Sequence, residues 1–153
     1  MKTFKSFLIE SDVKILASLG SEKRLSIKDL DQNSKDYLQS KYAIYEIDNV
    51  IKNDYSFPEH NSKRSRYFAI QDGVVIGAVN FELGKNDATI HHLGTTVKGV
   101  GKILLARVET DVKAAKLKKI TLFTYGGEED NFYQKHGYKK IEDDANRFEK
   151  ELT

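Results

Sequence analysis

The sequence predicts an α/β domain in which a short antiparallel meander is followed by alternating helices and strands. Two strand-like apolar runs meet at Asp72-Gly73, which is a two-residue hairpin signal because both positions must accept positive φ. Residues 100–117 carry apolar side chains at helical spacing, and this pattern predicts the longest helix of the chain. The 153 residues are enough for one such domain.

The composition is that of a soluble globular protein, with 39% apolar and 31% charged residues. The absence of cysteine excludes disulfides, thiolate metal sites and a cysteine nucleophile. No apolar run approaches the roughly 20 residues of a membrane span, and no secretory signal is recognisable at the N-terminus. A net charge of +2 indicates no charged partner. We therefore expect a cytoplasmic protein without a membrane or nucleic-acid partner, and the sequence does not indicate an oligomeric state.

The N-terminal third is expected to hold an extension followed by the start of the domain. Residues 1–22 precede the first expected strand, so we predict an extension at 1–22 and a domain at 23–153. One strand, two helices and a loop are expected next, at residues 24–30, 33–41, 45–54 and 57–66. The loop assignment depends on the only proline of the chain and on a run of basic side chains.

The remaining elements begin with the hairpin. Its strands are expected at residues 67–70 and 74–83, and a third strand at 88–93. Downstream of the long helix we expect a strand, a short helix and two further strands, at residues 120–125, 128–136, 138–141 and 147–152. Gly137 is predicted to end the short helix, because the residue after a helix end often needs a left-handed conformation.

A glycine-rich segment joins the third strand of the meander to the long helix. It reads Thr96-Val97-Lys98-Gly99-Val100-Gly101-Lys102. The N–H groups at a helix N-terminus are unpaired and lie at the positive end of the dipole, so they can hold a phosphate or pyrophosphate. The lysines at both ends of the Gly-x-Gly could add charge. The alternative is a turn that serves packing only, because Gly-x-Gly alone is weakly specific.

The order of elements, together with two motifs, resembles the GCN5-related N-acetyltransferase (GNAT) family. Gly99 and Gly101 occupy the two glycine positions of that family's pyrophosphate loop, and residues 132–138, Phe-Tyr-Gln-Lys-His-Gly-Tyr, match its second motif. The resemblance covers residues 24–152. Thr96 replaces the family's usual Gln or Arg, and the stretch before the loop is shorter and lacks the common proline.

The resemblance implies a three-layer α/β fold, with a mixed, mostly antiparallel twisted sheet that contains a splayed parallel pair. It also implies acetyl-CoA as cosubstrate, no metal, and transfer of the acetyl group to a primary amine of a protein or small molecule. The coenzyme-binding residues implied by the family's motif are Leu93, Thr95, Thr96, Val97, Lys98, Gly99, Val100, Gly101, Lys102 and Tyr133. The alternative is an inactive module of the same fold that recognises a protein partner.

Tyr133 corresponds to the tyrosine that often protonates the departing thiolate in this family, and its alternative role is to pack the short helix on the sheet. A glutamate that some relatives use as the base falls on Thr89, which cannot accept a proton. His91 is the substitute we prefer, because its ordinary pKa suits proton removal near neutral pH. Glu82 is a second candidate, acting through a water. Alternation along the strand turns His92 to the other face, and both histidines can equally be half-buried sheet residues without a function.

The first ten residues, Met-Lys-Thr-Phe-Lys-Ser-Phe-Leu-Ile-Glu, resemble the capsid-targeting peptide of internal head proteins in T4-like bacteriophages. That resemblance implies cleavage after Glu10, packaging in a virion, and delivery to the cytoplasm of the infected bacterium, where a host component would be modified. The alternative is a short amphipathic helix that docks on the domain, with Phe4, Phe7 and Leu8 along one side.

Overall fold

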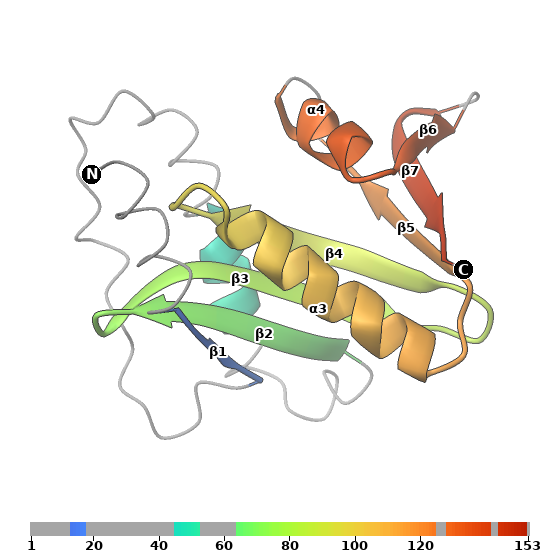
Figure 1. Ribbon diagram of the computed structural model, residues 1–153. Coiled ribbons are helices and arrows are strands. Elements are labelled where there is room, and N and C mark those ends of the chain that lie inside the picture. Colours follow the sequence, from blue (N-terminus) through green and yellow to red (C-terminus); the bar gives the residue numbers. More distant parts are fainter. Residues whose placement is uncertain (1–12, 18–44, 53–63, 125–127, 142–143, 153) are drawn as a thin grey trace.

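The computed structural model describes residues 13–17, 45–52, 64–124, 128–141 and 144–152. In this part of the chain, one seven-stranded sheet has the order β1-β2-β3-β4-β5-β7-β6 and carries helices on both faces (Figure 1). The strands are β1 (Lys14–Leu16), β2 (Arg64–Gln71), β3 (Val74–Leu83), β4 (Ala88–Thr95), β5 (Lys119–Phe123), β6 (Lys139–Ile141) and β7 (Asp144–Glu151). The labelled helices are α3 (Val100–Ala114) and α4 (Glu128–Lys135).

Every neighbouring pair of strands in this sheet is antiparallel except β4 and β5, which run parallel. The predicted hairpin is confirmed, because β2 and β3 are joined at Asp72 and Gly73 with φ of 52° and 73°. The predicted end of the short helix is confirmed as well, since α4 stops before Gly137 at a φ of 90°.

Two sequence predictions on the N-terminal side of the hairpin are wrong. Residues 64–66 were expected in a loop but belong to β2, where Arg64 pairs with Glu82 of β3. Residues 14–16 were expected in an extension outside the domain, but they form the edge strand β1 and pair with residues 68–70. This pairing gives a three-residue segment a partner that no local pattern reveals.

The predicted helix at 45–54 is confirmed over residues 45–52. The strand expected at 24–30, the helix expected at 33–41 and the targeting peptide at 1–10 lie outside the described residues. Among the residues that the structure describes, no helix is both long and apolar enough to cross a bilayer.

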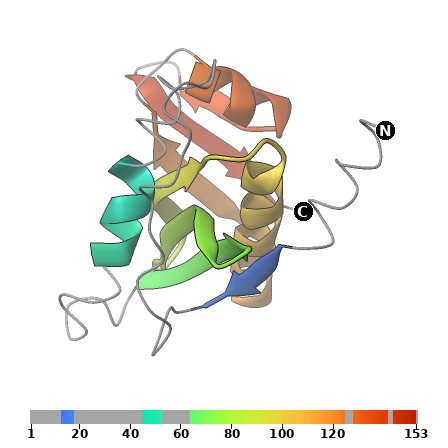
Figure 2. The same cartoon turned by 90° about the vertical axis from the view of Figure 1, so that its left-hand side faces the viewer.

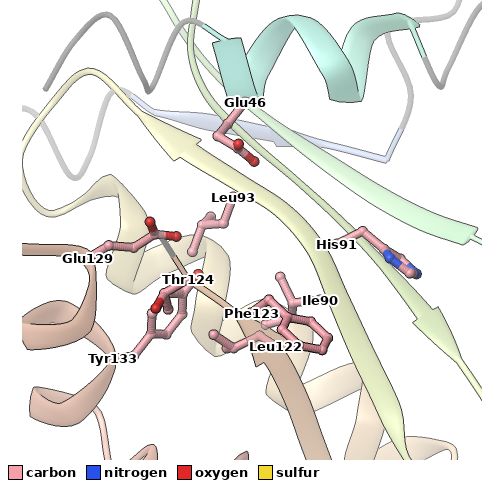
Figure 3. Close-up of a pocket in the computed structure, with 9 residues that line it drawn as sticks. All are labelled: Glu46, Ile90, His91, Leu93, Leu122, Phe123, Thr124, Glu129 and Tyr133. Carbon is pink, nitrogen blue, oxygen red and sulfur yellow. The ribbon is translucent and has the colours of Figure 1, made fainter. Parts of the chain in front are cut away.

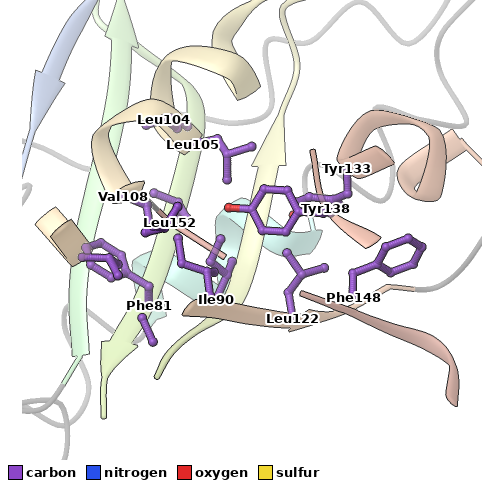
Figure 4. Packing of buried hydrophobic residues seen from close by; sticks show 14 of the residues in the cluster. Phe81, Ile90, Leu104, Leu105, Val108, Leu122, Tyr133, Tyr138, Phe148 and Leu152 are labelled. Carbon is purple, nitrogen blue, oxygen red and sulfur yellow. The ribbon is translucent and has the colours of Figure 1, made fainter. Parts of the chain in front are cut away.

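The larger hydrophobic core lies between α3 and one face of the sheet (Figure 4). Leu104, Val108 and Val112 point into it along one side of α3 and are fully buried. The helix ends at Ala114, three residues before its predicted end at 117. The chain turns there because Lys116 adopts a φ of 65° and the N–H of Leu117 donates to the carbonyl of Val112.

The second core lies on the opposite face of the sheet, under the helical residues 45–52 (Figure 2). Ile47 and Val50 pack there against Phe68 and Ile70 of β2, whereas Ala69 between them belongs to the α3 core. This alternation follows from the period of two along a strand. The predicted three-layer arrangement is therefore observed, and its helix at 45–52 faces the end of the sheet where the parallel pair opens.

Candidate active site

A cavity of about 110 Å³ opens where the two parallel strands separate (Figure 3). Strands β4 and β5 are paired over only three residue pairs, the last of which joins Ile90 to Leu122. Beyond that pair the strands diverge. Ligands bind preferentially at the carboxyl ends of parallel strands, where side chains from several elements converge. The cavity is lined by Glu46, Ile90, His91, Leu93, Leu122, Phe123, Thr124, Glu129 and Tyr133.

A β-bulge in β4 lies beside this opening. Asn80 of β3 pairs with His92 and Phe81 pairs with Ile90, so His91 is the extra residue of the bulged strand. A bulge bends its strand and redirects side chains next to it. In this protein the bend coincides with the place where β4 leaves β5.

Glu46 is the cavity residue that the sequence analysis missed. It comes from the helical residues 45–52, is only 9% exposed, and its Oε1 has no hydrogen-bond partner among the described residues. Burial and the nearby charge of Glu129 raise its pKa from 4.5 to about 7, although a backbone hydrogen bond from Leu93 acts in the opposite direction. The sequence offered one signal for Glu46, which is that this charged residue directly precedes Ile47, an apolar position on the buried side of the helix.

Tyr133 lines the opposite wall, on α4. Its ring is 3% exposed and makes edge-to-face contacts with Phe132 and Tyr138. Burial, followed by the negative charges of Glu129 and Glu46, raises the pKa of the phenol well above its ordinary value of 10.0. Tyr133 therefore keeps its proton at neutral pH. It packs the short helix on the sheet and faces the cavity at the same time.

His91 and Glu82, the two predicted bases, lie together on the neighbouring strands. His91 Nε2 is 3.4 Å from Glu82 Oε1, which is ion-pair distance without an aligned hydrogen bond. The imidazole points away from Tyr133 and toward β3 (Figure 3). Burial and then the charge of Arg64 lower the pKa of His91 below 6.5, against the opposite effect of Glu82. His91 is therefore neutral at physiological pH.

The two remaining polar residues of this part of β4 have partners within the sheet. His92 Nδ1 lies 3.1 Å from Oδ1 of Asn80, which accepts its proton. Thr89 Oγ1 lies 3.3 Å from the hydroxyl of Thr121 on β5. Both contacts hold the strands next to the opening.

The glycine loop adjoins the same end of β4 and leaves the N-terminus of α3 open. Gly99 is the N-cap of α3 at a φ of 94°, and a Cβ placed there would meet no heavy atom within 4 Å. No side chain caps this terminus. Lys98 and Lys102 are exposed on the two sides of Gly99 and Gly101. A helix N-terminus without a side-chain cap, open space and two cations form an arrangement that can hold a phosphate group.

Other side chains of the loop point inward. The hydroxyl of Thr96 donates to the carbonyl of Ile76 on β3, and Val100 is fully buried. A Cβ on Gly101 would lie 3.1 Å from the ring of Phe132. The second glycine therefore lets α4 pack closely on the start of α3, so the two motifs of the sequence are in direct contact. The backbone N–H groups of Thr96 and Val100 are also engaged, because they donate to the carbonyls of Ile76 and Val97.

Metal binding has no support in the described part of the chain, which contains no cluster of three or more His, Asp or Glu residues arranged around a common centre. The chemistry that the cavity offers is proton transfer. One wall carries a carboxylate whose pKa is about 7, and the other carries a protonated phenol.

Comparison with solved structures shows that the fold is shared with acetyltransferases of the GNAT family. The PaiA N-acetyltransferase of Thermoplasma acidophilum, solved with coenzyme A, has a TM-score of 0.59 and 22% identity over 92% of this chain and 99% of that chain. An acetyltransferase of Streptococcus agalactiae has a TM-score of 0.64 and 22% identity over the same shares of both chains. A GNAT acetyltransferase of Elizabethkingia anophelis with acetyl-CoA bound has a TM-score of 0.58 and 15% identity, again over 92% and 99%.

At sequence level, no protein-family model and no curated protein matches the chain. The structural likeness therefore establishes the fold alone. The predicted fold class, a GNAT acyl-CoA N-acyltransferase fold with a splayed parallel pair, is confirmed by the sheet and by these neighbours.

Proposed function

We propose that this protein is an N-acetyltransferase that transfers the acetyl group of acetyl-CoA to a primary amine. One observation carries the proposal. The cavity between the diverging ends of β4 and β5 lies beside an uncapped Gly-x-Gly helix terminus, and Tyr133 forms its wall. The solved neighbours that hold coenzyme A or acetyl-CoA support this assignment of the ligand.

The residues present fit the coenzyme. Gly99 to Lys102 would hold the pyrophosphate at the N-terminus of α3, where a Cβ on Gly99 would point into open space. The separated part of β4, residues 91–95, has backbone groups that β5 does not pair, and these would hold the extended arm. When bound, acetyl-CoA supplies a thioester whose carbonyl carbon an amine can attack.

The side chains of the cavity would divide the proton transfers. Tyr133 keeps its phenolic proton at neutral pH and can deliver it at Oη to a departing thiolate. His91 is neutral at physiological pH and can accept a proton at a ring nitrogen, either alone or with Glu82 through a water. The acceptor is a protein amine or a small molecule, and the reaction takes place in the cytoplasm.

Coenzyme binding tests the first half of this proposal. Calorimetry and thermal shift with coenzyme A should report binding to the wild type, because a ligand at 100 times its Kd stabilises the fold by about 2.7 kcal/mol. Gly99→Glu should abolish it. Gly73→Glu is the matched control, since Gly73 has a similar positive φ and open surroundings but lies in the β2–β3 turn. Equal binding by both variants would refute the phosphate site.

Turnover tests the second half. Thiol release from acetyl-CoA with a panel of amines should be slower in Tyr133→Phe, on the order of 100-fold for a lost general acid. Tyr138→Phe removes a hydroxyl from the same aromatic cluster outside the cavity, where it donates to Glu109. It should leave turnover unchanged. Coenzyme binding without turnover of any amine, or of proteins in a host extract, would instead indicate a binding module.

We also propose that the chain is packaged in a bacteriophage virion, trimmed after Glu10 and delivered to the host cytoplasm. The support is the resemblance of residues 1–10 to a capsid-targeting peptide. Mass spectrometry of purified virions should find the chain beginning at Ser11. A chain that still begins at Met1, or that is absent from the particle, would refute this part of the proposal without affecting the enzyme.

A further inference from the structure

We propose that Glu46 binds the ammonium group of the acceptor and accepts its proton, so that the acceptor is a cationic alkylamine entering between residues 45–52 and α4. The inference rests on the acetyltransferase function proposed above, and it names the class of acceptor and the proton acceptor of that site. The sequence resemblance favours His91 for this role. The geometry of the cavity points to a different side chain.

The first support is a buried carboxylate oxygen, Oε1 of Glu46, that lacks a partner among the described residues. Glu46 is 9% exposed, lines the cavity, and its Oε1 makes no hydrogen bond within the described part of the chain. A buried carboxylate oxygen without a partner is costly, and the backbone hydrogen bond from Leu93 leaves Oε1 unpaired within the described residues. Other acids of low exposure here have side-chain partners, since Glu109 binds Lys150 at 3.0 Å and Asp130 accepts from Thr124. A cation at Oε1 would complete the coordination of Glu46.

The second support is the charge of the surrounding walls. Glu129 and Tyr133 face Glu46 from α4, and His91 lines the same cavity from β4, whereas β5 contributes Thr124, which does not ionise. Tyr133 and His91 are neutral at physiological pH. Among the described residues that line the cavity, Glu129 and Glu46 are therefore the groups that can carry a negative charge at physiological pH. This charge favours an ammonium group and disfavours an acceptor with a nearby carboxylate or phosphate.

The third support is the relation between proton acceptor and proton donor. Glu46 hangs from the helix above the cavity and Tyr133 stands on the facing wall, while the imidazole of His91 turns toward Glu82 (Figure 3). Glu46, Glu129 and Tyr133 line one cavity, and the negative charges of the two acids act on the phenol. An amine held there would have the acceptor and the donor on opposite sides.

The proton transfers balance. An ammonium nitrogen carries three protons and the amide product carries one. As the N–H bond breaks, the first proton forms an O–H bond at Glu46 Oε1, and it later passes to water. Tyr133 gives its proton to the thiolate and regains the second proton of the nitrogen. The net products are an amide, a thiol and one proton in solution.

A binding experiment tests the cation site without turnover. In the full chain carrying ¹³C-labelled glutamate, the Glu46 carboxyl resonance is identified by its loss in Glu46→Gln. Adding n-butylammonium chloride should lower the pKa of Glu46, because a neighbouring cation favours the carboxylate. The neutral probe 1-butanol should leave it unchanged. Asp48→Asn alters an exposed acid on the same helix, ion-paired with Lys52, and should respond as the wild type. A Glu46 titration insensitive to butylammonium would overturn the proposal.

The pH profile of kcat/KM tests the proton transfer. Glu46→Gln should lower the rate with butylamine near pH 7 by about 100-fold or more, as expected for a lost general base. This difference in rate between Glu46→Gln and the wild type should shrink as pH rises, since the neutral amine then becomes abundant and needs no base. Asp48→Asn, which alters an acid of the same helix outside the cavity, should keep the wild-type profile. An unchanged profile in Glu46→Gln, or a profile lost only in His91→Gln, would overturn the assignment.

The experiments distinguish a failure of the acetyltransferase function from a failure of the Glu46 assignment. Thermal shift with coenzyme A should be equal in the wild type and Glu46→Gln, which shows that the variant is folded and keeps the coenzyme site. If the wild type acetylates no amine but butylammonium still lowers the pKa of Glu46, the acetyltransferase function fails and the cation site stands. If amines are acetylated at the same rate with and without Glu46, only the present inference fails.

Discussion

Replacing Glu46 with Gln should make the fold more stable at and above neutral pH, while it weakens the proposed activity. The folded-state pKa of Glu46 is raised from 4.5 to about 7, mainly by burial. At about 1.4 kcal/mol for each pKa unit, ionised Glu46 therefore costs the fold roughly 3 kcal/mol relative to its protonated form. Gln has nearly the shape of the protonated carboxyl and carries no charge.

The sign of the pH dependence follows from the direction of the change. Because the folded-state pKa is above the unfolded value, the stabilisation by protonated Glu46 is complete below pH 4.5 and is lost as pH rises through about 7. As the pH rises from about 5 to about 8, the unfolding free energy of the wild type should fall by about 2.5 kcal/mol relative to that of Glu46→Gln. Other groups titrate in both proteins and cancel in the comparison.

Urea unfolding of the two proteins at these pH values measures the effect, and the difference in unfolding free energy should grow with pH in favour of Glu46→Gln. The control is Asp48→Asn on the exposed side of the same helix. Its ion pair with Lys52, at 2.9 Å and open to solvent, is worth no more than about 1 kcal/mol. If the difference between wild type and Glu46→Gln were the same at both pH values, burial would not raise the pKa of Glu46, and the reasoning would be refuted.

Three further predictions concern the surroundings of the cavity. Gly77→Ala should lower the free energy of unfolding by about 1–3 kcal/mol, because its Cβ would lie 2.8 Å from Val100 Cγ1. Adding Val100→Ala should recover part of this loss in denaturant unfolding. Strictly additive effects of the two substitutions would contradict the contact. Phe123→Ser should raise the KM for the amine with little change in kcat, since this cavity-lining ring is 62% exposed and its loss should alter stability by no more than about 0.5 kcal/mol. A fall in kcat alone would contradict that reading. Glu129→Gln should move the acidic limb of the rate profile to lower pH, because the charge of Glu129 is the second cause that raises the pKa of Glu46; an unmoved limb would show that the two carboxylates do not interact.

The elements that the sequence predicted well are those with local signals. Asp72-Gly73 specifies its own turn, and the apolar stripe of α3 needs no partner to be recognised. The edge strand at residues 14–16 could not be predicted in the same way, because it is a strand only by pairing with β2. The end of α3 was placed too late, since the left-handed turn at Lys116 is not required by the lysine-rich sequence around it.

The candidate site was predictable where it depends on the backbone. Gly99 and Gly101 indicated an open helix terminus, and Tyr133 followed from the second motif. Glu46 was not predictable, because it becomes buried only when residues 45–52 pack on the sheet, next to Leu93 of β4. Its raised pKa also depends on Glu129, a neighbour that the helix at 45–52 does not reveal. A pKa near neutrality is a tertiary property, whereas a glycine turn is a local one.

The short parallel seam between β4 and β5 has a consequence for local opening of the sheet. In the described residues, only the pairs from Ala88–Ile120 to Ile90–Leu122 join the two halves of the sheet by backbone bonds. Amide protons along this seam should exchange with solvent through local opening faster than those of the longer β2–β3 ladder. A cosubstrate wedged between the halves would bridge them, so its arrival should slow exchange on both strands at once. The gap that admits the cosubstrate is thus also the place where the bound cosubstrate would hold the two halves of the sheet together.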